Sequence, residues 1–318
     1  MDHLTPPRPV LSFHGNGRDL FVVVIVNWLL TLVTFGLYYP WAKARKLQYL
    51  YQHTELAGHP FHFHGTGREM FIGFIKAVVL FGIIIAGAFA LGYHTIPQLG
   101  QLVVFVAGLI LFPLIVHGTL RYRLARSSWR GIHFGYRGER SALYTLCLRE
   151  GLAVLLTLGF YLPWFIIAVR NYTIGHMRYG DSRFAYKGNG GDLFLLNLKG
   201  QLLTIFTLGI YWFWWRRDRF HYWVDHFSWS VPNGPTLRFR GTARGEGFFK
   251  LLVGNVLLVV FTLGIGIPWA QVRYMRFNFR HIEMVGEADL DAIAQTEAEH
   301  KDATADDLGD LMDIGIFL

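Results

Sequence analysis

A three-residue phrase occurs five times along the 318-residue chain: an aromatic residue, a basic residue or histidine, and glycine. Its copies are Phe13-His14-Gly15, Phe63-His64-Gly65, Tyr136-Arg137-Gly138, Tyr186-Lys187-Gly188 and Phe239-Arg240-Gly241. The aromatic residues are 50, 73, 50 and 53 residues apart. A period near 50 residues is typical of one supersecondary unit that has been duplicated. The sequence therefore predicts a single array of five similar units.

Four of the five copies carry a second phrase, Thr-x-Gly, 21 to 23 residues after the aromatic residue. It occurs at Thr34–Gly36, Thr157–Gly159, Thr207–Gly209 and Thr262–Gly264, and a Pro-Trp pair or a close variant follows it. Apolar alternation before the first phrase indicates a strand, and glycine followed by a polar residue predicts a helix start. Thr-x-Gly predicts a helix end, and the proline predicts the first turn of a second helix. Each unit is therefore predicted to be strand, helix, turn, helix.

The predicted units form one membrane domain over residues 11–282. Their boundaries are 11–60, 61–131, 132–183, 184–236 and 237–282, and an acidic tail follows over 283–318. The tail is expected either to be a solvated extension or to dock on the basic part of the chain.

Composition indicates a membrane protein. The chain is 53% hydrophobic and only 16% charged, whereas soluble domains carry about a quarter charged residues. Residues 71–93 contain one charged residue, Lys76, and residues 101–117 contain none. Each run is long enough to cross a bilayer as a helix. The predicted fold class is an α-helical multi-pass membrane protein with a small β element on its cytoplasmic side.

The N-terminal segment before the first apolar run is polar. It lacks the pattern of a cleavable signal peptide, so the first apolar run is expected to remain in the mature protein.

Charge is distributed unevenly along the chain. Of the 22 acidic residues, 11 lie from Glu283 onward, beside one basic residue, Lys301. A basic body with long apolar runs favours anionic membrane lipids as partners rather than nucleic acid. The predicted turns contain no charged residue, whereas basic clusters such as residues 43–46 and 273–280 lie near the strands. If each unit is a hairpin, the positive-inside rule places the strands and both termini in the cytoplasm.

The short units leave one alternative open. If each short unit crossed the membrane once, the basic clusters would be divided between its two sides. The hairpin interpretation has a cost, because helices of about 16 residues reach only about 24 Å, less than the roughly 30 Å hydrocarbon core. Four hairpins are then expected to be re-entrant, while the longer second unit spans the bilayer.

Three motifs together resemble the bacterial YjgN-like inner-membrane family. They are the unit starts at Phe13–Phe21 and Phe63–Phe71, the Thr-Leu-Gly-Ile-x-x-Pro-Trp run at Thr262–Trp269 and the ending at Asp310–Ile316. The resemblance covers nearly the whole chain. It implies a multi-pass protein of the bacterial inner membrane, and it implies no activity because the family is one of unknown function. Phe213, where the other short units have proline, departs from the pattern.

The residue after each strand aromatic is the main candidate for binding. These residues are His14, His64, Arg137, Lys187 and Arg240. If the strands pair, their side chains share one face and form a surface for anions such as lipid phosphates. The alternative is that they only anchor the array at the lipid headgroups.

His62 and His64 share a strand face at i and i+2, so they are the candidates for a metal site. The position of His64 is occupied by arginine or lysine in three other units. The sequence therefore predicts no metal site and no cofactor.

A second candidate set lies within the apolar runs. Lys76, Arg149 and Lys199 occupy one offset, 13 residues after the strand aromatic, and Glu150 adjoins Arg149. Charges inside a membrane are costly and are often functional, so these residues are candidates for a polar path. The alternative is that they snorkel toward the surface.

Two functions remain open at this point. One is a transporter or channel-like protein for a small or lipidic substrate. The other is a non-transporting envelope scaffold that binds anionic lipid or a protein partner through the basic strands. No Ser-His-Asp set or carboxylate pair stands out in the sequence, so an enzyme is not expected.

Overall fold

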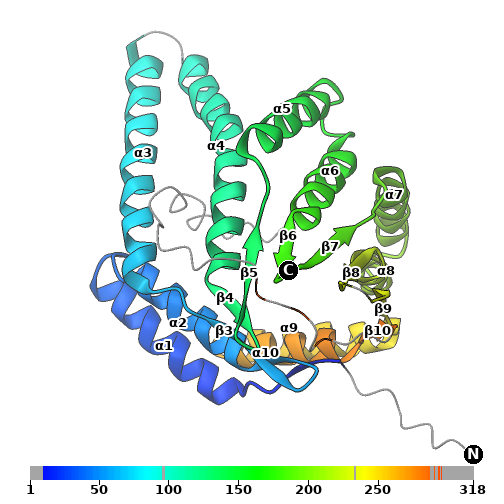
Figure 1. Ribbon diagram of the computed structural model, residues 1–318. Helices are drawn as coiled ribbons and strands as arrows, with labels where there is room; N and C mark the ends of the chain where they lie inside the picture. Colours follow the sequence, from blue (N-terminus) through cyan, green and yellow to red (C-terminus); the bar gives the residue numbers. More distant parts are fainter. Residues whose placement is uncertain are drawn as a thin grey trace, which may run out of the picture.

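The computed structural model describes residues 10–94, 97–232 and 234–286, together with Leu290, Ile293 and Gln295. Within these residues, ten helices form five consecutive pairs around a central group of strands (Figure 1). The helices are α1 (Gly17–Val33), α2 (Tyr39–Gln52), α3 (Gly67–His94), α4 (Pro97–Ala125), α5 (Arg140–Leu156), α6 (Leu162–Gly175), α7 (Gly190–Phe206), α8 (Trp212–Asp225), α9 (Gly245–Phe261) and α10 (Ile267–Arg280).

The strands form a near-closed antiparallel barrel. They are β1 (Leu11–Phe13), β2 (Thr54–Leu56), β3 (His59–Phe63), β4 (Ser127–Trp129), β5 (Ile132–Tyr136), β6 (Met177–Tyr179), β7 (Ser182–Tyr186), β8 (Phe227–Ser230), β9 (Thr236–Gly241) and β10 (Ile282–Val285). Each strand pairs with the next one along the chain, so the spatial order is the sequence order. The gap in the barrel lies between β1 and β10, and α10 packs against β1 there.

The prediction of one strand per unit was wrong. Each helix pair is followed by a second strand, which forms a hairpin with the first strand of the next unit. Several of these strands have only three residues, too few to show a period of two. The turns between the strands show the hairpins more clearly. Ala57 and Gly58, between β2 and β3, have φ angles of 49° and 81°, and Arg130 and Gly131, between β4 and β5, have φ angles of 51° and 79°. Two successive positive φ angles are typical of the tight turns that join hairpin strands.

The alignment of the fifth unit also needs correction. The backbone N–H after the first strand bonds to the residue that ends the second helix, as in His14 to His53 at 2.8 Å. In the fifth unit this bond joins Thr242 to His281 at 2.9 Å. Gly241 rather than Phe239 therefore takes the position of the strand aromatic, and Thr242 rather than Arg240 takes the position of His14. With this register Thr-x-Gly follows at a constant spacing of 21 residues.

The predicted helix signals are confirmed in most units. The side chains of Asn16 and Asn189 accept hydrogen bonds from the backbone of Arg18 and Gly191, as N-caps do. Pro40, Pro163 and Pro268 lie in the first turn of their helices. In the second unit Pro113 instead lies inside α4, so the helix continues through it.

Glycine–tryptophan contacts join neighbouring units into a ring. A Cβ atom added to Gly67, Gly190 or Gly245 would collide with the tryptophan of the preceding unit. The partners are Trp41 for Gly67, Trp164 for Gly190, Trp214 for Gly245 and Trp269 for Gly17. The last pair connects the fifth unit with the first, and Arg276 Nη2 donates to the carbonyl of Gly15 at 2.9 Å beside it. The ring of helix pairs is therefore closed although the strand barrel is not.

Two helices in the described part of the chain are long and apolar enough to cross a membrane. They are α3, over Gly67–Gly92, and α4, over Gln98–Ala125, with mean hydropathies of 2.5 and 2.6. Few residues in the most apolar stretch of each helix are buried, unlike those of a core helix in a soluble protein. The helices of the other four pairs have 17 and 14 residues, and α3 and α4 extend well beyond them in Figure 1.

Candidate functional site

A cavity of about 400 Å³ lies between the strand barrel and the inner ends of α4, α6 and α8. We call it the chamber. Its lining is almost entirely apolar and comes from both layers of the fold. The lining residues are Leu11, Leu56, Phe61, Leu124, Trp129, Phe134, Arg170, Ile174, Met177, Tyr179, Phe184, Trp223, Val224, Phe227, Trp229, Phe239 and Ile282. The volume lies within the range of small-molecule binding sites, about 300 to 1,000 Å³.

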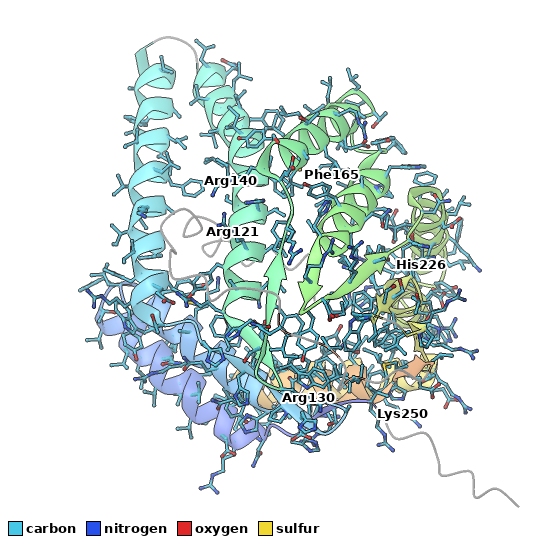
Figure 2. All side chains as sticks on the ribbon, in the orientation of Figure 1. Arg121, Arg130, Arg140, Phe165, His226 and Lys250 are labelled. Atoms are coloured by element: carbon cyan, nitrogen blue, oxygen red, sulfur yellow. The ribbon has the colours of Figure 1, made fainter. Side chains whose placement is uncertain are left out.

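The strand wall of the chamber is a layer of interlocked aromatic rings. Trp129, Tyr179 and Trp229 are fully buried, and their ring centroids lie 5.4 to 6.3 Å apart. Phe134 and Phe184 extend the layer at 6.4 Å from each other. Offset and edge-to-face contacts at these distances stabilise the layer beyond the burial of its area. Figure 2 shows the side chains that project from the strands and from the surrounding helices.

The polar atoms in this layer are used by the protein itself. The Tyr179 hydroxyl donates to the Trp129 carbonyl at 2.9 Å, and Trp129 Nε1 donates to the His59 carbonyl at 3.0 Å. Trp229 Nε1 donates to Ser182 Oγ at 2.8 Å. Burial raises the pKa of Tyr179 well above its ordinary value, so its hydroxyl stays neutral. The strand wall is therefore held rigid by its own bonds, and apolar ring surface faces the cavity.

Arg170 is the one charged residue among those that line the chamber in the described part of the chain. Its guanidinium carbon lies 4.8 Å from the ring centroid of Tyr186 and 4.5 Å from that of Trp223. Two aromatic faces at these distances hold a guanidinium by cation–π attraction. The chamber thus combines an apolar interior with one fixed positive group.

The start of the tail packs against the aromatic layer. Ile293 is 5% exposed and packs in the cluster with Trp129 and Trp229, and Leu290 packs against the same cluster. Gln295 Oε1 accepts from the backbone N–H of His133 in β5 at 3.1 Å. Ile293 and Leu290 therefore pack with the aromatic cluster, whereas Gln295 contacts His133, whose ring lies 5.5 Å from that of His64. Residues from 296 onward, with the ending over 310–316, lie outside the described residues.

All five predicted strand-end residues are exposed on the outside of the barrel. His14 Nε2 lies 3.2 Å from Glu55 Oε2, and His64 Nε2 lies 2.8 Å from Ser128 Oγ. Arg240 lies within β9 and pairs in register with Glu283 of β10. Glu283, which begins the tail in the sequence interpretation, is therefore part of the barrel.

The outer surface contains further arginines that sequence reasoning did not select. We call the basic wall the group formed by Arg137, Arg178, Arg183, Lys187, Arg238 and Arg240 on β5–β9 or just beyond their ends. Arg178 and Arg183 are register partners, so their side chains share one face. Arg183 precedes Lys187 by four residues, and Arg238 precedes Arg240 by two. Because residues at even spacing along a strand lie on the same face, this spacing could have predicted that Arg183 and Arg238 belong to the basic surface.

The histidine candidates His62 and His64 lie beside His133 of β5. The rings of His62 and His64 lie 6.3 Å apart, and those of His64 and His133 lie 5.5 Å apart. No group of three or more metal-ligating side chains is found among the described residues.

The candidates for a polar path lie on three separate helices. Lys76, Arg149 and Lys199 are exposed on α3, α5 and α7 and do not meet one another. Glu150 is buried, and its Oε1 accepts from Arg149 Nε and Nη2 at 2.9 and 2.7 Å. The charges of Arg149 and Glu150 therefore compensate each other on α5.

Arg170 is the functional candidate that sequence reasoning missed, although a signal was present. It lies 34 residues after the strand aromatic Tyr136. The equivalent positions in the corrected register are apolar: Leu47, Leu120, Phe220 and Met275. A single charge at a position that is otherwise apolar is typical of a functional residue inside a core.

Comparisons with known proteins identify a family. A family model described as "Bacterial protein of unknown function (DUF898)" matches residues 8–196 and 226–311. Three similar proteins are each named "Inner membrane protein YjgN". The protein of Salmonella typhimurium strain LT2 is 32% identical over 165 residues, and those of Escherichia coli O157:H7 and K12 are 27% and 26% identical over 166 residues. Each alignment covers 52% of this chain and 40% of the relative. No solved structure matches the chain.

Proposed function

We propose, from the premise that this chain belongs to the DUF898 family of bacterial proteins of unknown function, that it is an inner-membrane protein that binds a small lipidic substrate in the chamber and moves it as a transporter does. The observation that carries the proposal is the aromatic chamber of about 400 Å³ with one charged residue among its described lining residues. Its relatives are named inner membrane proteins. The proposal includes no catalytic step and no cofactor.

The chemistry of the lining favours an amphiphile with one negative group. An acyl chain or ring system would bury apolar surface against Phe134, Phe184 and Trp229, at roughly 25 cal/mol per Å². A carboxylate or phosphate would pair with the guanidinium of Arg170, whose stacking on Tyr186 and Trp223 fixes its position. Leu124 of α4 also lines the chamber, so the site adjoins a helix able to cross the membrane.

We place the protein in the membrane as a multi-pass protein with its barrel and both termini in the cytoplasm. The basic wall supports this orientation because arginine and lysine are enriched on the cytoplasmic side of inner-membrane proteins. We also propose that the five units arose by internal duplication. Tyr49, Tyr172 and Tyr222 each bridge the backbone N–H and carbonyl of the residue that starts the preceding helix, at 2.6 to 3.0 Å. The same bond at the same offset supports a common origin for these units.

The binding step is tested by filling the chamber. Val224 lines the chamber on α8, and Val256 is 59% exposed on α9, so Val224→Trp and Val256→Trp form a matched pair. Mass spectrometry of small molecules and lipids that co-purify should show a species that Val224→Trp loses at least about tenfold and Val256→Trp retains. Equal retention by both variants would contradict binding in the chamber.

Transport is tested separately in proteoliposomes loaded with the co-purifying species. Movement across the bilayer that stops in the Val224→Trp protein, but not in the Val256→Trp protein, is the expected result. Binding without movement would leave the chamber as a binding site and reject the transporter.

The basic wall favours a second candidate function, a scaffold that binds anionic lipid. Arg183 and Arg238 are exposed on neighbouring parts of the barrel surface, and their β7 and β9 strands both pair with β8. For this function, Arg183→Glu with Arg238→Glu should reduce binding of the detergent-solubilised protein to phosphatidylglycerol vesicles several-fold. Lys250→Glu, an exposed change on α9, should not. An unchanged affinity in the double variant would remove this candidate.

A further inference from the structure

Four of the helix pairs end in turns that share one unusual construction. We call these turns the tips; they comprise residues 34–39, 157–162, 207–212 and 262–267. The second residue of each tip is a large apolar side chain directed away from the protein. Phe35 is 97% exposed, Leu158 91%, Leu208 94% and Leu263 94%. A protein in water gains nothing from four such side chains, because each leaves its full apolar area hydrated.

The same four residues also have an unfavourable backbone conformation. Phe35, Leu158, Leu208 and Leu263 have φ angles of 50° or 51°. The left-handed region is unfavourable for a residue with a side chain, because its Cβ atom comes too close to the following carbonyl oxygen, and glycine or asparagine would occupy it more easily. A bulky apolar residue is therefore held both strained and exposed at the same place in four turns. Such a residue needs an apolar surrounding that the protein does not supply.

The hydrogen bonds of the tips fit a surrounding without water. In the first tip all six backbone N–H groups from Thr34 to Tyr39 donate within the helix pair. The Thr34 hydroxyl completes the set: it donates to the Leu30 carbonyl at 2.7 Å and accepts from the Tyr38 N–H at 3.0 Å. Thr157, Thr207 and Thr262 make the same pair of bonds. Because hydrocarbon offers no partner to an unpaired backbone donor, this complete set suits a turn in contact with lipid tails.

Length limits how far the tips reach. A helix of 17 residues, such as α1, is about 25 Å long and one of 14 residues, such as α2, is about 21 Å long. Both are shorter than the hydrocarbon core of roughly 30 Å. The tips also carry no Lys, Arg, Asp or Glu that would meet water on a far side. In contrast, α3 and α4 have 28 and 29 residues and are long enough to cross.

We infer that the four tips end among the acyl chains inside the bilayer, entering and leaving by the barrel face, while only the α3–α4 pair crosses. The partner of Phe35, Leu158, Leu208 and Leu263 is the lipid hydrocarbon itself. The protein is then embedded asymmetrically, with four shallow hairpins beside one that spans the bilayer. This inference does not depend on what the chamber binds.

Cysteine labelling of the full-length protein tests the inference. Cys147 is buried, so a Cys147→Ala background removes the native thiol. Single changes Phe35→Cys, Leu158→Cys, Leu208→Cys and Leu263→Cys report the tips. Ala57→Cys, in the turn between β2 and β3, reports the barrel side, and Leu99→Cys, near the start of α4, reports the far side. Each protein is reconstituted in liposomes of one orientation and treated with a membrane-impermeant maleimide from outside or from inside.

The expected result is labelling of Ala57→Cys from one side, of Leu99→Cys from the other, and of the tips from neither. All sites should label after addition of sodium dodecyl sulfate. Tip labelling from the Leu99 side would show that the short pairs span the bilayer, and tip labelling from the Ala57 side would show that they are not embedded. Either result overturns the inference.

A second measurement tests whether the tip cysteines escape labelling because they contact another copy of the protein rather than lipid. A nitroxide attached at the tip cysteines should be accessible to oxygen, which concentrates in hydrocarbon, and inaccessible to a water-soluble nickel chelate. Spin–spin broadening together with low accessibility to both agents would assign the tips to a contact between copies and would overturn the inference.

Discussion

At the scale of single residues, glycine and tryptophan define how neighbouring units meet. Gly190 begins α7 where the ring of Trp164 lies across it, and an added Cβ atom would lie 2.7 Å from the Trp164 Cα. The third unit has Arg140 at the position of this glycine. The second unit, which precedes it, has Leu114 at the position of the tryptophan. Glycine is therefore present in the units whose preceding unit supplies the indole ring.

A matched pair of alanine substitutions tests this contact. Gly190→Ala should lower stability by about 1 to 3 kcal/mol because the close backbone contact cannot relax. Gly151→Ala, at a helix position with nothing within 4 Å of the added Cβ, should raise it by about 0.5 to 1 kcal/mol. Thermal unfolding in detergent should separate the two in sign. A Tm for Gly190→Ala at or above that of the parent protein would disprove the steric account.

The tyrosine that bridges a helix start gives a second prediction. The Tyr172 hydroxyl accepts from the Glu139 N–H at 2.9 Å and donates to the Glu139 carbonyl at 3.0 Å. Tyr172→Phe should cost about 1 to 2 kcal/mol, because two backbone groups lose their partner. The fifth unit has Phe277 at this offset, so the fold itself should survive the change. An unchanged Tm in the Tyr172→Phe protein would contradict a stabilising role for the bridge.

Much of the helical framework could be predicted from single residues. Asn16, Thr34 and Pro40 each have a local physical role, as cap, turn and first-turn residue, that does not depend on distant contacts. The exposed basic strand ends followed from the period of two. The role of Arg170 and the second strand of each unit could not be predicted from single residues. Their roles depend on packing between units, and only an exact register shows Arg170 at a position that is otherwise apolar.

At the scale of elements, the start of the tail is part of the barrel core. Ile293→Asp would place a carboxylate against Trp129 and Trp229 and should cost about 3 kcal/mol or more. Val285→Asp, at a position that is 53% exposed in β10, is the control and should change stability by less than about 0.5 kcal/mol. Thermal unfolding measures both. Equal, small effects would show that Ile293 does not hold the tail in the barrel.

At the scale of the whole molecule, the contact between the first and last units closes the ring. If the ring is closed, Trp269→Ala at that junction and Trp164→Ala between the third and fourth units should have similar costs, about 2 to 4 kcal/mol each. In an open array the junction of the two ends would contribute far less. A Tm loss for Trp269→Ala that is a small fraction of that for Trp164→Ala would therefore contradict ring closure.

The chamber of the proposed function lies within the ring of helix pairs. Five helix pairs surround a strand barrel, and the same aromatic layer lines the chamber and contacts Ile293 at the start of the tail. Lys76, Arg149 and Lys199 lie on the outside of separate helices, so they do not form a polar path that leads into the chamber. A substrate that enters from the lipid would reach Arg170 between α6 and α8, the elements that carry Arg170 and Trp223.

The most direct test of the central claim is an electron cryomicroscopy map of the full-length protein in lipid nanodiscs. The account predicts elongated non-protein density in the chamber between Phe134, Phe184 and Trp223, with its polar end at Arg170. A map that resolves these side chains and shows no density between them, or shows the rings collapsed into the cavity, would contradict it.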